Sequence, residues 1–397
     1  MQRTEVFHRE ELAKRLADDL MSEEGASGLF ITGPRRTGKS TFIREDLIPV
    51  LKKKYASEVV YADLWEDRAA NPGDVIVSAI KAQLLQYDGF ILKAAGGVGL
   101  DRFKVGGLEM SLDNIGIGKG ETLSKALTML AAASKKPVTL IIDEAQQTQV
   151  TEEGRQALYA LKAARDSMNS TAGAGFRLLA TGSNSDKLAS LVEDKDQAFY
   201  QAPLMPLPTL GKDYLQWFRN KQNFEPKPSI EAMIEAFDHC NHRPEPFRAV
   251  FKALKYKTDV TPEDIDEVFM SMVASSLASA KANFLQQVNG LNPLDLAALK
   301  VMARDDKKFS PYSKTSFADY KAFIFAQTGE MPEAIPQSSV QQALERLRGE
   351  KFVWRAGRGA YLIEDTQHAV WMKEVVEQSV DDVDRARREI NARVATS

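Results

Sequence analysis

The stretch GLFITGPRRTGKSTFIRE, residues 28–45, places three glycines and several basic residues between an apolar run and an amphipathic run. It matches the pattern G-x-x-x-x-G-K-[ST] at Gly33, Gly38, Lys39 and Ser40. The apolar run reads as a short buried strand, and the segment after the loop has the 3.6-residue period of a helix. In this order the loop forms a phosphate site, because backbone N–H groups and the helix N-terminus both point at the anion. The stretch therefore predicts a P-loop nucleotide-binding domain.

The loop residues have predicted roles toward ATP and Mg²⁺, the two cofactors that we expect. Lys39 would reach the β and γ oxygens, the Ser40 hydroxyl would ligate Mg²⁺, and Thr41 would face the α-phosphate or the base. Glycines allow the close approach and the backbone angles that side chains resist. The residues expected to line the nucleotide are Gly33, Pro34, Arg35, Arg36, Thr37, Gly38, Lys39, Ser40 and Thr41.

Length and composition fit an ordinary chain of two or three globular domains. The 397 residues are 44% hydrophobic and 27% charged, with a net charge of -3, so a nucleic-acid surface would have to be a local patch. Cys240 is the single cysteine, which excludes a disulfide framework and favours a reducing compartment. The N-terminus carries no apolar signal core, and no apolar run approaches the ~20 residues that span a bilayer. We therefore expect a cytoplasmic protein without a membrane partner.

A second motif, KKPVTLIIDEAQQ at residues 135–147, supplies paired acids. Its continuous apolar run is typical of a central parallel strand that is covered on both faces. The run ends in Asp143 and Glu144, at the carboxyl edge where open α/β sheets bind ligands. Asp143 would hold Mg²⁺ through its water shell, and Glu144 would orient and deprotonate the attacking water. With Lys39, these acids are the predicted catalytic residues of an ATPase.

Together, GPRRTGKST and LIIDEAQ resemble the AAA+ ATPases, specifically the prokaryotic archaeal-type ATPase group, which is related to origin-recognition initiators and STAND NTPases. The resemblance implies a parallel sheet with helices on both faces, then a helical lid and a C-terminal winged helix. In VFHREELAKRL, residues 6–16, Phe7 and Arg9 would lie near the adenine. VVYADLWED would be the second strand, ending at Asp63.

The resemblance also implies sensor residues near the γ-phosphate. FRLLATGSNSDKL, residues 176–188, looks like the fourth strand with Ser183 or Asn184 as its polar sensor, although turn chemistry also explains these two. In CNHRPEPFRAVF, residues 240–251, Arg243 and Arg248 are candidates for contact from the lid, or else surface arginines.

Two features depart from the AAA+ pattern. The connection between the fourth and fifth strands, residues 192–208, contains Lys195 but no arginine, so an arginine finger from this position is doubtful. Residues 94–120 read as a glycine-punctuated β-hairpin inserted into the core, which would contact DNA or a neighbouring subunit or simply lie on the surface.

The predicted domains follow these patterns. The nucleotide-binding core covers residues 1–208, the helical lid 209–290, the winged helix 291–375 and a helical tail 376–397. Three prolines in PLMPLP mark the exit from the core, and the tail is expected to be a docking helix or a short coiled coil. The third helix of the winged helix is expected to be capped by Ser338 or Ser339. This helix and the wing carry candidate nucleic-acid contacts at Arg346, Arg348, Lys351, Arg355 and Arg358.

Two classes of function fit these patterns. One is an ATP-driven switch or assembly factor that acts on double-stranded DNA through the winged helix. The other is a STAND-like sensor or defence ATPase, in which the nucleotide state controls binding to a protein partner. A third alternative is a nucleotide-binding scaffold without turnover. The missing arginine favours the second class or this third alternative, and the basic wing favours the first. A protein partner and a homo-oligomer are expected in either case.

Overall fold

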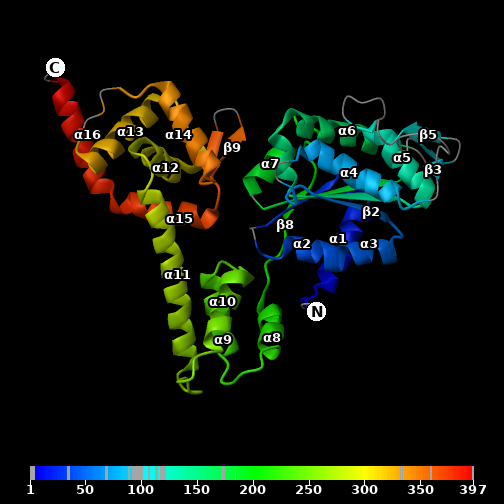
Figure 1. Ribbon diagram of the computed structural model, residues 1–397, viewed down its shortest axis with the longest axis horizontal. Coiled ribbons are helices and arrows are strands. Elements are labelled where there is room, and N and C mark those ends of the chain that lie inside the picture. The colour runs from blue at the N-terminus through cyan, green and yellow to red at the C-terminus, as the bar shows by residue number, and fades with distance from the viewer. Residues whose placement is uncertain are drawn as a thin grey trace, which may run out of the picture. The chain divides into compact units, whose positions relative to one another are not determined.

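The computed structural model describes residues 5–395 apart from 34–35, 68–69, 88–89, 92–101, 106–107, 112–114, 117–121, 171–174, 184, 331, 333 and 358–359. For 90–91, 102–105, 108–111, 185–186, 307, 355–357, 360, 366, 391 and 393–395 it describes the backbone alone. The chain forms two compact units, Met1–Met270 and Ser271–Ser397. The predicted core, residues 1–208, lies in the first unit, and the predicted winged helix and tail, residues 291–397, lie in the second (Figure 1). The predicted lid, residues 209–290, is divided between the two units after Met270.

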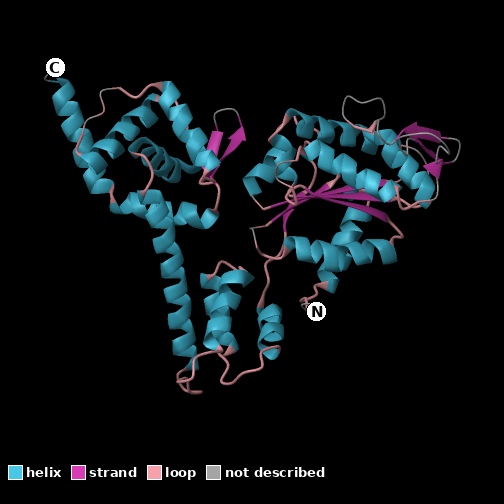
Figure 2. Ribbon diagram, in the orientation of Figure 1, coloured by secondary structure: helices cyan, strands magenta, loops and turns pink. Residues whose placement is uncertain are grey.

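A five-stranded sheet, in the order β2-β6-β7-β1-β8, is the centre of the first unit (Figure 2). All its paired neighbours run parallel, so the carboxyl ends of the strands meet at one edge. This confirms the predicted parallel P-loop sheet. Two prolines in and after β8 fit its edge position, because proline cannot donate to a central ladder. The strands are β1 (Leu29–Thr32), β2 (Glu58–Asp63), β6 (Val138–Asp143), β7 (Phe176–Gly182) and β8 (Leu204–Pro206).

Helices cover both faces of this sheet, as Figure 1 shows. Alternate residues of one strand pack on opposite faces: Phe30 belongs to the cluster under α4–α7, whereas Ile31 belongs to the cluster against α1–α3. Burial on both faces explains the continuous apolar runs that predicted these strands. The helices are α1 (Glu10–Met21), α2 (Lys39–Phe42), α3 (Ile48–Lys54), α4 (Pro72–Leu84), α5 (Leu123–Ser134), α6 (Glu152–Asn169) and α7 (Ser185–Glu193).

The helix after the phosphate loop runs without a gap from Lys39 to Lys54, close to the predicted 40–55, but its middle part is not α-helical. A π-helical segment, Ile43–Leu47, separates α2 from α3. Pro49 lacks the N–H that a regular α-helical turn would need at its position. Asp46 within the π segment is buried, and its carboxylate accepts hydrogen bonds from His8 Nδ1 at 2.6 Å and Arg9 N at 3.0 Å. Asp46 in the π-helical segment therefore connects His8 and Arg9 to the helix that follows the phosphate loop.

The predicted hairpin lies largely outside the described residues, but its strands are described. β4 (Arg102–Val105) and β5 (Leu108–Ser111) pair antiparallel, with Phe103 opposite Met110. A short strand, β3 (Phe90–Ile91), joins β4 to complete a three-stranded sheet.

The helical lid follows β8. Its first helix is amphipathic, and Phe218, Phe237, Phe247 and Phe251 form one aromatic cluster at centroid separations of 5.1–5.8 Å. Ser229 caps one lid helix by accepting a hydrogen bond from Ala232 N at 3.1 Å. The helices are α8 (Lys212–Asn220), α9 (Ile230–His239), α10 (Pro244–Leu254) and α11 (Ile265–Asn289).

Helix α11 was not foreseen as a single element of 25 residues. It is the one helix in the described part of the chain that is long and apolar enough to cross a membrane by length and composition alone. Its two ends belong to different cores: Phe269 packs on Phe247 and Phe251 of the lid, while Phe284 and Val288 are buried in the second unit.

The second unit has three helices followed by two antiparallel strands, the order predicted for a winged helix. The third helix begins at Gln337 behind Pro336 and has no side-chain cap, so the predicted cap at Ser338 or Ser339 is wrong. The elements are α12 (Pro293–Asp305), α13 (Lys314–Thr328), α14 (Gln337–Gly349), β9 (Val353–Gly357) and β10 (Ala360–Ile363).

Two further helices, α15 (Thr366–Gln378) and α16 (Val380–Ala395), complete the second unit. The predicted tail, residues 376–397, covers only the end of α15 together with α16. Arg387 of α16 donates to Asp319 of α13 at 2.6 Å, and Arg304 of α12 donates to the other oxygen of Asp319 at 2.6 Å. Val383 is buried in the same core. The tail is therefore a docked helix, which is one of the two predicted forms.

Candidate nucleotide and catalytic site

The phosphate loop connects β1 to α2 at the carboxyl edge of the sheet. Gly38 adopts φ = 87°, a left-handed conformation that favours glycine. Lys39 is buried and its Nζ donates to the Gly33 carbonyl at 2.6 Å, while Gly33 N donates to Gly182 O at 3.2 Å. The loop therefore folds around its own lysine, beside the end of β7. Thr37 is buried, Ser40 is half-buried and Thr41 is exposed; Pro34 and Arg35 lie outside the described residues.

Asp143, at the end of β6, is held by hydroxyl groups from both neighbouring strands. The Tyr61 hydroxyl of β2 donates to Oδ2 at 2.7 Å, and the Thr181 hydroxyl of β7 donates to Oδ1. The carboxylate is 1% exposed. Burial and the neighbouring Asp143 charge raise the pKa of the Tyr61 phenol well above its usual range, so this hydroxyl remains a donor at physiological pH. Two neutral donors thus fix the orientation of the acid without neutralising it.

Glu144 follows Asp143 in a left-handed backbone conformation, φ = 58°, which turns its side chain toward β7. Its Oε2 accepts hydrogen bonds from Ser183 Oγ at 2.7 Å and from Ser183 N at 3.3 Å. The Gln146 side-chain amide donates to the same oxygen. The structure therefore joins the predicted general base to the predicted sensor Ser183; the other sensor candidate, Asn184, lies outside the described residues.

Arg44 lies at the outer side of this site. Its Nη2 donates to Asp63 Oδ2 at 2.7 Å, and its guanidinium lies 4.9 Å from the centroid of the Tyr61 ring. Asp63, the last residue of β2, also accepts from Trp65 N at 2.9 Å. The Arg44 bond thus links the end of β2 to the π-helical segment that follows α2. This network supports the tyrosine that contacts Asp143.

The donor set of the site fits Mg²⁺. The Ser40 hydroxyl and the Asp143 carboxylate are hard oxygen ligands, and Mg²⁺ is typically held by one or two such groups together with substrate phosphates. The Asp143 charge is not consumed by a basic side chain, since its hydrogen bonds in the described part of the chain come from neutral donors.

The predicted base-binding residues lie between the core and the lid. Phe7 packs against Tyr214 and Trp217 of α8, each at 5.6 Å between centroids. The Arg9 guanidinium lies 4.6 Å from the Phe42 ring and donates to the Pro208 carbonyl at 2.8 Å. Both side chains thus bind the N-terminal segment to the hinge between the sheet and the lid.

The two lid arginines differ in their surroundings. Arg248 Nε donates to the Tyr214 hydroxyl at 2.9 Å, and its guanidinium lies over the Tyr214 and Phe218 rings. Arg243 precedes α10, and its Nε donates weakly to the Cys240 carbonyl at 3.4 Å. A third arginine connects the loop to the lid, because Arg36 forms an exposed ion pair with Glu245 at 2.7 Å. In this arrangement Arg36, rather than Arg248, reaches between the loop and the lid.

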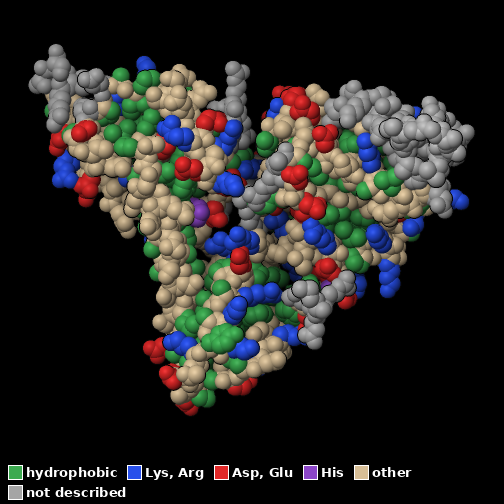
Figure 3. All heavy atoms as spheres, in the orientation of Figure 1, with side chains coloured by type: hydrophobic (Ala, Val, Ile, Leu, Met, Phe, Trp, Pro, Cys, Tyr) green, Lys and Arg blue, Asp and Glu red, His purple; other side chains and the backbone are tan. Residues whose placement is uncertain are grey.

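The residues predicted to contact nucleic acid also differ in their surroundings. Arg346 donates through Nε and Nη2 to both oxygens of Asp295, at 2.9 and 2.7 Å, and Asp295 is 2% exposed. Arg348 pairs with Glu345 on the helix surface, and Lys351 is exposed. The Arg355 side chain and Arg358 lie outside the described part. Figure 3 shows acidic and basic side chains interspersed on the visible face of this unit, rather than one basic field.

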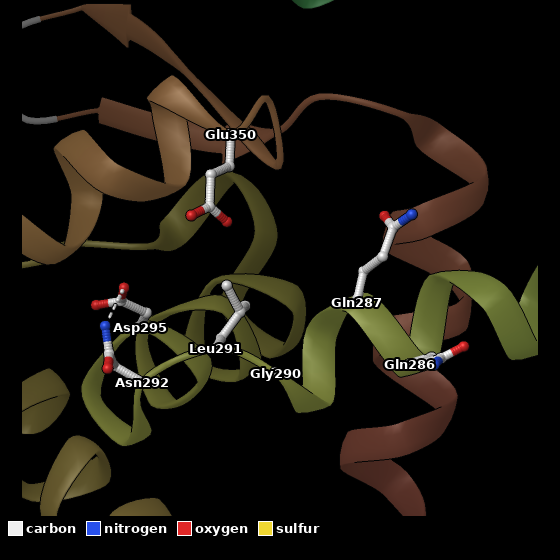
Figure 4. A pocket seen from close by; sticks show the side chains of 7 residues that line it. All are labelled: Gln286, Gln287, Gly290, Leu291, Asn292, Asp295 and Glu350. Atoms are coloured by element: carbon white, nitrogen blue, oxygen red, sulfur yellow. Dashed lines mark hydrogen bonds between the residues drawn. The ribbon is translucent and has the colours of Figure 1, made fainter.

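A cavity of 380 Å³ in the second unit lies between the end of α11 and the end of α14. Figure 4 shows Asn292 and Asp295 side by side on it, joined by a 3.5 Å hydrogen bond. Because Asp295 is already paired with Arg346, its charge stabilises the helix packing and is not free for a ligand. The remaining lining residues are Gln286, Gln287, Gly290, Leu291 and Glu350.

Sequence reasoning missed Tyr61, Thr181 and Gln146. Tyr61 and Thr181 reach the acids because their strands pair with β6, and Gln146 does so through the turn after β6. A local sequence motif does not indicate either kind of contact. One signal was available: parallel pairing places Asp63 opposite Asp143 and Tyr61 opposite Ile141, so a long polar side chain two residues before the end of β2 can reach the acid.

No family model matches this sequence, and no curated protein matches it. Solved structures do. The ORC2 protein of Aeropyrum pernix in its ADP form matches with a TM-score of 0.55 and 14% identity, over 98% of this chain and 96% of that one. The same protein in its ADPNP-ADP complexes matches with a TM-score of 0.51 over the same shares. At this identity the likeness shows the fold. The chain has the fold of the Aeropyrum pernix ORC2 protein, with a parallel sheet covered by helices, a helical segment after it, and a second unit of three helices and two antiparallel strands.

Proposed function

We propose that this protein is a Mg²⁺-dependent ATPase whose nucleotide state controls a second, winged-helix unit. The observation that carries the proposal is the meeting of Lys39, Asp143, Glu144 and Ser183 at the carboxyl edge of a parallel sheet. That edge is where open α/β folds bind ligands. A protein of the same fold has been solved with ADP, which supports a nucleotide as the ligand.

We assign the following roles to the residues of the site. Lys39 exchanges its bond to the Gly33 carbonyl for the β and γ oxygens, and the N-terminus of α2 faces the same phosphates. Bound Mg²⁺ would neutralise developing charge on the phosphate oxygens, with Ser40 and Asp143 as its ligands. Glu144 orients the attacking water and accepts its proton, while Ser183 contacts the γ-phosphate.

Lys39→Ala tests the nucleotide site. Loss of the ammonium should weaken ATP binding at least about tenfold, equivalent to ~1.4 kcal/mol, in a fluorescent-nucleotide titration. Lys52→Ala is the matched control, because Lys52 is exposed on α3 and should leave the affinity unchanged. Equal affinities for the wild type and Lys39→Ala would refute the assignment of the loop.

For the second unit we propose double-stranded DNA as the partner. The exposed face of α14 carries Ser338, Gln341, Gln342 and Arg348, and amide side chains on such a helix can pair with base edges in a major groove. Exposed Lys351 follows the helix and would contact phosphates. Arg346 is left out of this surface because Asp295 holds it.

A salt series tests the DNA proposal. Fluorescence anisotropy with a labelled duplex should give affinities that fall with salt, with a log–log slope of about −0.9 per neutralised phosphate. Arg348→Glu with Lys351→Glu should weaken binding to all duplexes and flatten that slope, while ATP binding is kept. Undetectable or salt-independent binding by the wild type would refute DNA and favour the alternative, a STAND-like sensor that binds a protein partner.

A further inference from the structure

Arg36 belongs to the phosphate loop, but its side chain contacts the lid. Its Nη1 lies 2.7 Å from Oε2 of Glu245, which stands in the first turn of α10. Both side chains are largely exposed, at 70% and 59%. The backbone N–H groups of such a loop face the phosphates, whereas this guanidinium is paired with a carboxylate on another element. The proposed reaction does not use this contact between the loop and the lid.

The backbone on both sides of the ion pair is held in costly conformations. Arg36 has φ = 64°, and the turn before α10 contains Asn241 at 52° and His242 at 53°. His242 Nδ1 is also buried without a hydrogen-bond partner among the described residues. Left-handed residues other than glycine persist only where their surroundings hold them, and they gather at ligand clamps and switch regions. The two segments that meet in the ion pair are therefore not in the conformations that their own residues prefer.

The ion pair is too weak to be explained as a contact that stabilises the fold. Water screens two exposed charges, and holding two long side chains in one geometry costs rotamer freedom. The other side of the lid is attached differently: Phe7 packs on Tyr214 and Trp217 at 5.6 Å between centroids, and Tyr214 is 1% exposed. The lid is thus held firmly at α8 by buried aromatic packing and weakly at α10 by one exposed ion pair.

We propose that Arg36 and Glu245 form a latch that sets how fast a nucleotide enters and leaves the site. The lid turns about its α8 side and opens at α10 when the ion pair separates. Separation lets the turn before α10 relax, and the attraction between the two side chains opposes it. This inference rests on the proposed nucleotide-binding function and adds its regulation.

The test is the release of a fluorescent ADP analogue, chased with excess unlabelled ADP in a stopped-flow instrument. Glu245→Ala should release the analogue about threefold faster than the wild type, the effect of one exposed ion pair. Loading should accelerate by the same factor, so the affinity should stay within about twofold, because the latch joins two protein groups and does not bind the nucleotide. Glu235→Ala is the matched control, since Glu235 is exposed on α9, and it should release the analogue at the wild-type rate.

Two further measurements assign the effect to this ion pair. Added salt should speed release from the wild type toward the rate of Glu245→Ala, and it should change the rate of that variant less. In the Arg36→Ala background, Glu245→Ala should give no further gain, because the latch is already open.

A direct contact between Arg36 and the phosphates would give the opposite pattern. Glu245→Ala would then free the arginine and slow the release, while Arg36→Ala would weaken the affinity. That result, or release by Glu245→Ala at the wild-type rate, would refute the latch and leave the nucleotide-binding function standing. A wild type that binds no nucleotide would refute both.

Discussion

Both units bury acidic side chains, but they treat the charge in opposite ways. In the nucleotide core, Asp143 and Glu144 are held by hydroxyl, amide and backbone N–H groups. In the second unit, Asp295 is held by Arg346, and Asp319 by Arg304 and Arg387. Asp143 and Glu144 stand at the end of the central strand β6, whereas Asp295 lies on α12 and Asp319 on α13.

This difference separates a functional acid from a structural one. Neutral donors orient a carboxylate and leave its charge for a ligand cation or a proton, whereas an arginine fork neutralises the carboxylate and fixes two helices. Asp295 and Asp319 thus resemble the acids of the core in burial and differ from them in role.

Glu144→Gln should abolish turnover and keep binding. The amide retains the size of the carboxylate but cannot accept a proton, so phosphate release should fall by about 10²-fold or more. ATP affinity, measured on the same sample, should stay within about twofold, because the loop is intact. Glu193→Gln, at the exposed end of α7, is the control that should behave as the wild type.

Arg346→Ala should unfold the second unit more easily and leave ATP binding unchanged. It removes the fork on Asp295, which is 2% exposed, and leaves a buried charge without its main partner. Removing one member of a buried pair costs about 3–5 kcal/mol, and since the guanidinium side is partly exposed we expect about 2–3 kcal/mol in urea unfolding.

Two variants sharpen this prediction. Arg348→Ala, two residues further on α14, removes only a surface pair with Glu345 and should change the unfolding free energy by less than about 0.5 kcal/mol. The double variant Asp295→Leu with Arg346→Met removes both charges and should recover most of the loss. Equal stability of Arg346→Ala and Arg348→Ala would contradict a structural role for Asp295.

Arg387→Ala should have a smaller effect than Arg346→Ala. Asp319 keeps its second partner, Arg304, so the carboxylate is never left alone. We expect a loss of about 1 kcal/mol in urea unfolding and a tail that is more accessible to protease. Arg388→Ala, on the exposed side of the same helix, should change neither measurement; a loss as large as that of Arg346→Ala would show that the two arginines on Asp319 are not redundant.

Tyr61→Phe should change the magnesium requirement alone. It removes the hydroxyl that orients Asp143, so the Mg²⁺ concentration for half-maximal turnover should rise about fivefold, as for one hydrogen bond. Tyr55→Phe makes the same change at a hydroxyl that contacts surface Asp18, and it should leave the requirement unaltered. An unchanged requirement in Tyr61→Phe would mean that Thr181 is sufficient to hold the acid.

The local part of this architecture could be predicted from the sequence. The glycine spacing around Lys39 and the apolar run before Asp143 are short-range signals, and a strand, β1 or β6, lies at each of the two apolar runs that predicted one. The three helices and two strands of the second unit were also predicted, because each begins and ends with its own turn residues.

The roles that depend on distant partners could not be predicted. Arg346 and Arg348 look alike on a helix rich in arginine, and only Asp295, 51 residues earlier, distinguishes them. The π segment around Asp46 depends on His8 and Arg9, which lie 38 and 37 residues away along the chain. Gln146 reads as an ordinary turn residue until the end of β7 is placed beside it.

The most direct test of the central claim is phosphate release from ATP by the wild-type chain, with Mg²⁺ and with EDTA, alongside a binding titration on the same sample. The account predicts that ATP binds, that phosphate is released in Mg²⁺ and that EDTA stops the release, because the charge of Asp143 is kept for the metal. A chain that binds ATP but releases no phosphate in Mg²⁺, or that releases it equally in EDTA, would contradict the account.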